Sequence, residues 1–162
     1  MVLDPADEKV VADVAEHGFH SLGVEGEGVH PQFRYSVGFW ESLNSPEVLI
    51  YGLDLKLAHS MLWEMFRQIK AGKMLRDRER WSGLLEGYDC ISRPIDPSQF
   101  PDHVGFALWY RRFRLGDASN LRAFQLFWPS VNDGHYPWEQ GCPPRVRNLQ
   151  PLLYLPLAVG IA

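Results

Sequence analysis

The sequence predicts a single α+β domain over residues 1–162, with a mainly antiparallel sheet of about six strands, one principal amphipathic helix and a short N-terminal helix. Three observations support this fold class. Several segments alternate apolar and polar residues, which is typical of half-buried strands. One longer segment places apolar residues every three or four positions, as an amphipathic helix does. No repeat, linker or low-complexity tract divides the chain. A sheet of this kind could also curl toward a barrel.

The composition is that of a globular protein. Hydrophobic residues make up 46% of the chain and charged residues 22%, which excludes a disordered or fibrous protein. A domain of this length buries roughly 70% of its unfolded surface, so no disulfide or structural metal is required to hold it. Nine Phe, six Tyr and six Trp predict an aromatic-rich core or pocket.

The N-terminal segment predicts a short helix followed by a strand. Asp4 is a typical N-cap, Pro5 suits the first helical position, and Gly18 suits a left-handed C-terminal residue, so the helix should cover about 5–16. The segment 19–26 then has strand character and runs into a glycine-rich turn.

Two strands are expected in the next part of the chain. The segment 33–39, FRYSVGF, alternates strictly, and one of its faces carries the small residues Ser36 and Gly38. Something bulky, either a ligand or another side chain, could lie against that face. The segment 47–53, EVLIYGL, is almost continuously apolar and suits a strand buried on both faces.

The principal helix should begin after Asp54 and end at Gly72. Its apolar residues recur at three- and four-residue steps: Ala58, Met61, Leu62, Met65, Phe66 and Ile69.

The C-terminal half is harder to interpret. We expect an irregular charged segment over 74–87, a weaker strand over 88–95 and a proline-punctuated loop over 96–102. The segments 104–113 and 121–128 are interpreted as the two strands of a hairpin, because turn residues lie between them.

Several classes of protein are disfavoured. The N-terminus has no basic region followed by an apolar run, so no secretory signal is expected. The apolar segment 152–162 is short and broken by Pro156, which favours a buried strand or docked tail over a membrane helix. With only Cys90 and Cys142, reduced thiols and a cytoplasmic location are the default. The net charge of −4 argues against a nucleic-acid partner.

The stretch QLFWPSVNDGHYPWEQG, residues 125–141, holds the densest group of chemically useful side chains. His135 could act as a general base oriented by Asp133 or Glu139, which makes these three the candidate catalytic residues. The candidate ligand-binding residues combine aromatic faces with polar groups in apolar surroundings: Tyr35, Ser36, Gly38, Gln125, Trp128, Tyr136, Trp138 and Gln150. A purely structural role is the alternative for each of them, since large aromatic residues more often fill cores.

Other polar residues are better explained without a ligand. Glu47 is expected to form a structural ion pair with Arg34. Arg111, Arg112 and Arg114, with Arg122 across the proposed hairpin, form the basic cluster of the sequence. On a strand, Arg112 and Arg114 would share a face, which could bind a phosphate or carboxylate or simply be solvated. Cys142, between Gly and Pro, is expected to be exposed. No histidine has the spacing of a structural zinc site, so no metal is predicted.

Several motifs occur together in a fixed order: YSVGF (35–39), SPEVLIYGL (45–53), IKAGK (69–73), QLFWPSVNDGHYPWEQG (125–141) and QPLL (150–153). In these the chain resembles the bacterial family named domain of unknown function 4262, over about residues 17–154. The resemblance implies no defined activity. The family pattern has Asp directly after Trp-Pro, where this chain has Ser130. If that carboxylate were a base or ligand in relatives, Asp133 or another group would have to replace it here.

The sequence is therefore compatible with three functions. The first is a small-molecule pocket, in an enzyme or a binding protein, lined by the 125–141 loop and the Ser36/Gly38 face. The second is a non-catalytic interaction module or homodimer, since residues 1–69 are acidic and residues 70–162 mildly basic. The third is flavin binding, because the element order over 33–71 is similar to that of flavin-binding split barrels of the flavin reductase type. The sequence does not determine which cofactor, if any, is used.

Overall fold

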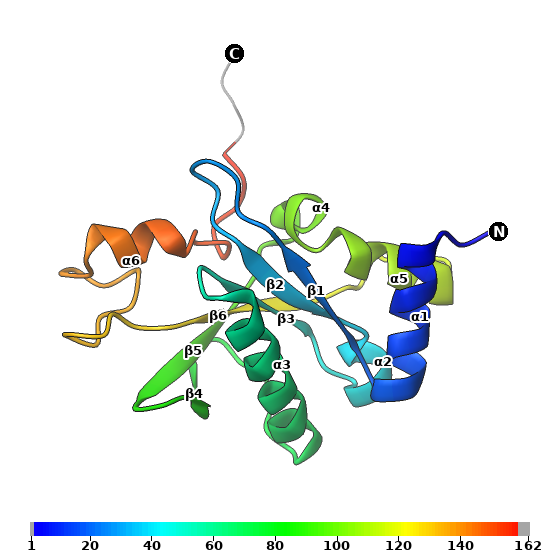
Figure 1. Cartoon of the computed structure of the whole chain (residues 1–162), viewed down its shortest axis with the longest axis horizontal. Coiled ribbons are helices and arrows are strands. Elements are labelled where there is room, and N and C mark those ends of the chain that lie inside the picture. Colours follow the sequence, from blue (N-terminus) through cyan, green and yellow to red (C-terminus); the bar gives the residue numbers. More distant parts are fainter. Residues whose placement is uncertain (1, 159–162) are drawn as a thin grey trace.

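Six strands form one open sheet in the computed structural model, which describes residues 2–158 (Figure 1). The strands follow the order β1-β2-β3-β6-β5-β4, so β1 and β4 are the edges. Neighbouring strands are antiparallel except β3 and β6, which run parallel. The strand bounds are β1 His20–Val24, β2 Phe33–Val37, β3 Glu47–Tyr51, β4 Glu79–Leu85, β5 Tyr88–Pro94 and β6 Ala123–Phe127.

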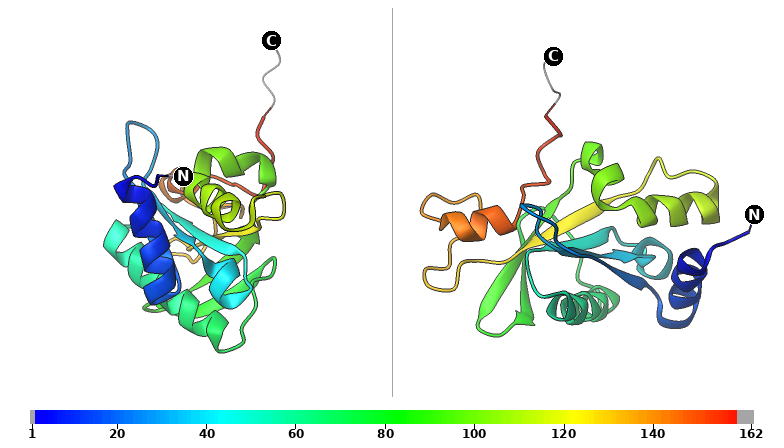
Figure 2. Two further views of the ribbon diagram at one scale, coloured as in Figure 1. Left: turned by 90° about the vertical axis from the view of Figure 1, so that its right-hand side faces the viewer. Right: turned by 45° about the horizontal axis from the view of Figure 1, so that its top comes forward.

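Helices cover both faces of this sheet (Figure 2). The helix α3 lies against one face, and α4 and α5 lie against the other. The helix bounds are α1 Pro5–His17, α2 Phe39–Leu43, α3 Leu55–Lys70, α4 Phe100–His103, α5 Gly105–Leu115 and α6 Pro144–Leu149, with a 3₁₀ turn η1 at Pro97–Gln99. Among residues 2–158, no helix combines the length and the apolar character needed to cross a membrane.

The core is divided by the sheet into two apolar clusters, and β3 contributes to both. Val48 and Ile50 pack with the apolar face of α3, whereas Leu49 and Tyr51 pack with α4, α5 and α1. This confirms the prediction of a strand buried on both faces. Asp54 accepts hydrogen bonds from the backbone of the first turn of α3, as its N-cap position requires.

Most of the predicted elements are found, but the predicted barrel is not. The sheet is mixed and open, so the prediction of closure is wrong. The flavin-binding hypothesis came from the element order over 33–71. That order is present as β2, β3 and α3, but the sheet that contains it is open and not a barrel. The predicted α+β class, N-terminal helix and principal helix are present. The number of strands is six, as predicted, and five of the predicted strands are among them.

Three predicted segments have a different structure. The loop expected over 96–102 contains the 3₁₀ turn η1 and most of the helix α4. The segment 104–113 is not a strand but belongs to the helix α5. Its residues Ala107 and Tyr110 are buried, and Gly116, with φ 78°, ends the helix. The segment predicted to be irregular contains β4. A bulge between Trp81 and Leu85 breaks the two-residue alternation by which a strand is recognised.

The end of the chain is docked rather than extended into the sheet. The backbone N–H of Asp96 donates to the carbonyl of Leu153 at 2.8 Å, and the N–H of Leu157 donates to Ser98 Oγ at 2.9 Å. The prediction of a docked tail therefore holds for this part. Residues 159–162 lie outside the described residues.

Candidate functional site

The loop after β6 is folded into a tight turn around Ser130. The Ser130 N–H donates to the carbonyl of His135, and its hydroxyl accepts from the His135 N–H at 3.0 Å. The N–H of Gly134, whose φ is 71°, donates to the Ser130 carbonyl. Ser130 is 2% exposed, so its side chain stabilises the loop from the inside through these hydrogen bonds.

His135 lies beside Asp133. Its Nδ1 is 3.3 Å from Asp133 Oδ2, without the geometry of a hydrogen bond. The Ser130 hydroxyl donates a hydrogen bond to Asp133. This bond and the one from the His135 N–H lower the pKa of the Asp133 carboxyl. Both side chains are about two-fifths exposed.

A second turn follows and holds an aromatic pair. The N–H of Tyr136 donates to Glu139 Oε1 at 2.8 Å, and the Glu139 N–H donates back to the Tyr136 carbonyl. The rings of Tyr136 and Trp138 stack with centroids 5.4 Å apart and planes inclined by 12°. The Tyr136 hydroxyl donates to the Asp89 carbonyl at 2.6 Å, which ties the loop to β5.

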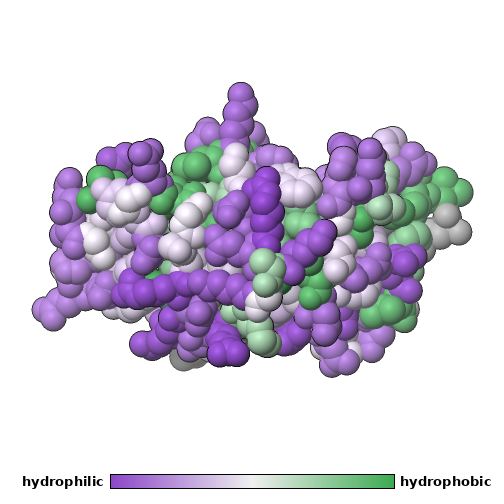
Figure 3. Space-filling model, turned by 90° about the horizontal axis from the view of Figure 1, so that it is seen from below, coloured by the Kyte–Doolittle hydropathy of each residue, from purple (hydrophilic) through white to green (hydrophobic). Residues whose placement is uncertain are grey.

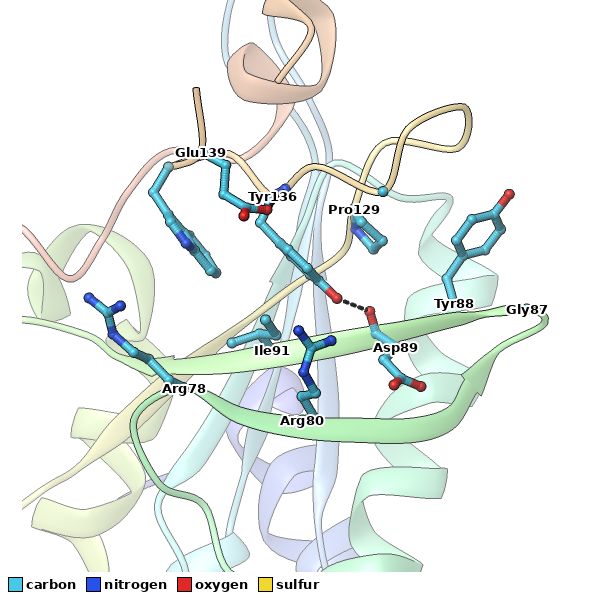
Figure 4. A pocket seen from close by; sticks show the side chains of 11 residues that line it. Arg78, Arg80, Gly87, Tyr88, Asp89, Ile91, Pro129, Tyr136 and Glu139 are labelled. Carbon is cyan, nitrogen blue, oxygen red and sulfur yellow. Dashed lines mark hydrogen bonds between the residues drawn. The ribbon is translucent and has the colours of Figure 1, made fainter. Parts of the chain in front are cut away.

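A pocket of about 560 Å³ opens between this loop and the β4–β5 hairpin (Figure 4). We call it the hairpin pocket. It is lined on the loop side by Pro129, Gly134, Tyr136, Trp138 and Glu139, and on the hairpin side by Arg78, Arg80, Gly87, Tyr88, Asp89 and Ile91.

The hairpin side supplies two cations that the sequence did not point to. In Figure 4, the guanidinium groups of Arg80 on β4 and of Arg78, the residue before β4, extend toward the loop. Arg78 has a φ of 63°, a conformation unfavourable for a residue with a Cβ, and its N–H donates to the Ser92 carbonyl at 2.8 Å. Backbone strain of this kind is often found at binding sites.

A third arginine, Arg93, contacts the aromatic pair at Trp138. Arg93 is 9% exposed, and its guanidinium carbon lies 5.0 Å from the Trp138 ring centroid and 3.8 Å from that of Tyr154. Its Nε also donates to Asp77 at 3.2 Å. These contacts help to hold Trp138 in place.

The two predicted glutamines bind backbone groups of the protein itself. Gln125 donates to the Pro151 carbonyl and accepts from the Leu153 N–H. Gln150 accepts from the N–H of Trp128 and donates to its carbonyl. Both side chains are essentially unexposed, and they join β6 to the segment that follows α6.

Tyr35, Ser36 and Gly38 lie in the interior, away from the hairpin pocket. The Tyr35 hydroxyl accepts from the Phe106 N–H at 3.1 Å. A Cβ at Gly38 would lie 2.8 Å from a Val14 methyl carbon, so α1 occupies the space beside this glycine. The sequence allowed either a ligand or another side chain beside Gly38, and in the structure the Val14 side chain lies there.

Glu47 is a fully buried carboxylate at the start of β3. It accepts from Gly38 N at 2.6 Å, from Ser36 Oγ at 2.8 Å and from Phe39 N at 2.9 Å. Burial raises the pKa of Glu47 to about 7, although these donors oppose the rise. The predicted ion pair with Arg34 is wrong. Arg34 is in register with Ile50, farther along β3, and donates instead to Leu55 O, Ser21 O and Ser21 Oγ.

Trp128 lines a separate pocket of about 300 Å³ on the α6 side of the loop, together with Ser130 and Asp133. Its indole N–H donates to the Tyr51 carbonyl at 2.8 Å. The predicted residues are therefore distributed over two pockets and the core, except His135, which is partly exposed and lines neither pocket. Only Tyr136, Trp138 and Glu139 of them line the hairpin pocket.

Cys142 is buried, at 4% exposure, and burial raises the pKa of its thiol, so the prediction that it is exposed is wrong. Cys90 is also buried, and neither cysteine forms a disulfide. Within residues 2–158, no cluster of three or more His, Cys, Asp or Glu side chains is arranged to hold a metal ion.

A comparison with known protein families matches residues 13–143 to the family described as "Domain of unknown function (DUF4262)". No curated protein and no solved structure matches the sequence.

Proposed function

We propose that this protein, which belongs to the DUF4262 family, binds a small organic anion that carries a ring in the hairpin pocket. Membership confirms the family resemblance seen in the sequence motifs. It defines no activity, so the proposal rests on the geometry of the pocket. The observation that carries it is the position of Arg78 and Arg80 opposite the stacked Tyr136 and Trp138.

The size and the cations suit such a ligand. A volume of about 560 Å³ lies within the range of roughly 300–1,000 Å³ that is common for small-molecule sites. Among residues 2–158, Arg80 has no ion-pair partner, and the nearest carboxylate oxygen to Arg78, on Asp77, is 4.0 Å away. Guanidinium groups bind carboxylate and phosphate through two parallel hydrogen bonds.

The aromatic pair provides the surface for the ring. Tyr136 is held by its hydroxyl and its N–H, and Trp138 is held by Arg93, so neither must be ordered when a ligand binds. Pre-ordered aromatic side chains reduce the entropic cost of binding. Asp89 and the remaining oxygen of Glu139 add acceptors for a ligand hydroxyl or amine.

The proposal is binding rather than a defined reaction. Of the three candidate catalytic residues, Glu139 lines the hairpin pocket, Asp133 lines the Trp128 pocket, and His135 lines neither. We also propose that the protein is cytoplasmic. Cys90 and Cys142 are free thiols, as is usual for proteins of that compartment.

Titration with phenyl phosphate, followed by NMR, tests the proposal. We expect saturable shifts of the Tyr136 amide and Trp138 indole signals, which uncharged benzyl alcohol should not reproduce. Arg80→Gln should weaken binding by at least about tenfold, because a hydrogen bond to a charged group is lost. Arg76→Gln is the matched control, since Arg76 is exposed and lies outside the pocket. Equal losses in the two variants would refute the proposal.

The interaction module is the weaker candidate. The face of the molecule seen in Figure 3 is largely hydrophilic, and its apolar residues form separate small patches. The free edge of β4 is also covered by side chains. Gln68 Nε2 donates to the Ser82 carbonyl at 2.7 Å, and Lys73 Nζ donates to the Arg80 carbonyl. Covered edges of this kind prevent pairing with a strand of another chain.

A further inference from the structure

A third pocket lies near the start of β6, whereas the hairpin pocket lies beyond the end of that strand. We call it the α2–α5 pocket. Its volume is about 270 Å³, and three segments meet around it: the end of α2, the second half of α5 and the turn before β6. The polar side chains that line it are Trp40, Asn44, Ser45, Arg111, Asn120 and Arg122.

The charges around this pocket are unbalanced. Arg111 and Arg122 both line it, and no acidic side chain does. Within the described part of the chain, neither arginine forms a salt bridge. Because like charges at close range repel each other, two guanidinium groups on one small cavity favour an anion between them.

The neighbouring acids already have other partners. Glu41 accepts from Tyr110 Oη at 3.0 Å and from Arg114 Nε at 2.8 Å. Asp117 accepts from the backbone N–H and the hydroxyl of Ser119 within its own turn. Among residues 2–158, Arg111 forms no salt bridge, although its charge opposes the rise in the pKa of the buried Glu47 and helps to lower the pKa of Asp117.

Trp40 gives an independent indication of a missing acceptor. Its Nε1 is shielded from solvent and has no hydrogen-bond partner among residues 2–158. The Arg111 guanidinium carbon lies 4.8 Å from the centroid of the same ring. A buried N–H without an acceptor is unfavourable, and an oxyanion that binds Arg111 would bring an acceptor to this indole.

We infer that the α2–α5 pocket is an anion site that binds a phosphate or carboxylate group through Arg111 and Arg122, with Asn44, Asn120 and the Trp40 indole as further donors. The sequence grouped Arg111, Arg112, Arg114 and Arg122 as one basic cluster and favoured Arg112 and Arg114 as the pair that could bind an anion. Arg112 and Arg114 lie two positions apart on a helix and do not share a face, and Arg114 is engaged by Glu41. The structure instead brings together Arg111 and Arg122, eleven positions apart.

The test is a titration with inorganic phosphate at constant ionic strength, adjusted with sodium chloride. The readout is the indole N–H signal of Trp40 in the NMR spectrum, assigned from Trp40→Phe. We expect a saturable shift of this signal. Arg122→Gln should weaken phosphate binding by about tenfold or more. Because Arg122 is exposed, its replacement should leave the fold intact, and a melting curve verifies this.

Arg112→Gln is the matched control. It removes the same charge from an exposed position on α5 that does not line the pocket, and its affinity should stay within about twofold of the original. A parallel titration with acetate distinguishes a carboxylate site from a phosphate site, and saturable binding of either anion supports the inference. A linear shift without saturation, or equal weakening by Arg112→Gln, would overturn it.

Discussion

The hydroxyl of Ser36 donates to Glu47 Oε1 at 2.8 Å and accepts from the N–H of Val48 at 2.9 Å. This serine therefore joins the end of β2 to the start of β3, where the backbone pairing of the two strands has stopped. The Glu47 carboxylate in turn accepts from the N–H groups of Gly38 and Phe39, which begin α2. A buried carboxylate thus takes the place of a side-chain cap on this helix.

Glu47 should make the stability of the protein depend on pH. Its pKa is about 7 in the folded state, above the ordinary value of 4.5, so the folded protein keeps a proton that the unfolded chain loses between these pH values. The contribution to stability is fully present below pH 4.5 and is lost as the pH rises through 7. Relative to Glu47→Gln, the free energy of unfolding should fall by on the order of 3 kcal/mol across this range. Urea denaturation at several pH values measures it.

Glu16→Gln is the matched control, because Glu16 is exposed on α1. Its stability should run parallel to that of the original protein at every pH. A constant difference between the original protein and Glu47→Gln would contradict the role assigned to the buried carboxyl.

Ser130→Asp, which introduces the residue of the family pattern, should destabilise the loop at neutral pH. The new carboxylate would lie beside Asp133, which would lose the Ser130 hydroxyl as a donor and gain a like charge. The melting temperature should drop by several degrees at pH 7 and by less at pH 4, where a carboxyl can be protonated. The double variant Ser130→Asp/Asp133→Asn should recover most of the loss. A loss that does not depend on pH would exclude charge repulsion as its cause.

Gln150→Ala should be strongly destabilising without any ligand present. The fully buried amide satisfies both the N–H and the carbonyl of Trp128. Two unsatisfied buried backbone groups should lower the free energy of unfolding by about 2–4 kcal/mol, as measured by chemical denaturation. Gln140→Ala, at an exposed position in the same region, should change it by less than about 0.5 kcal/mol. If the two variants were equally stable, the amide would not be a structural link.

The covered edge of β4 should keep the protein monomeric. Light scattering of the original protein should give the mass of one chain at all concentrations. The double variant Gln68→Ala/Lys73→Ala exposes the carbonyls of Ser82 and Arg80 and should associate as its concentration rises. A stable dimer of the original protein would instead favour the interaction module.

The sequence located part of the candidate site and missed the rest for an identifiable reason. Tyr136, Trp138 and Glu139 stand out in a polar turn flanked by prolines, and they do line the hairpin pocket. Arg78 and Arg80 belong to a charged segment whose strand is interrupted by a bulge, so the sequence pattern did not reveal that they face the loop. Gln125 and Gln150 are buried polar residues, for which a ligand and a backbone partner are equally consistent with the sequence.

The sequence by itself determined the α+β class, the helices after Asp4 and Asp54, and the strands β1, β2, β3, β5 and β6. Local periodicity and capping residues are sufficient for these elements because both act over a few neighbouring positions. Only the tertiary structure decided that the sheet is open, that α5 is a helix, and which charged residues meet. Glu47 accepts from Gly38 instead of pairing with Arg34. Of the basic cluster that the sequence indicated, it is Arg111 and Arg122 that line one pocket, not Arg112 and Arg114. Strand register and helix packing fix these contacts between residues distant in sequence, and neither follows from local pattern.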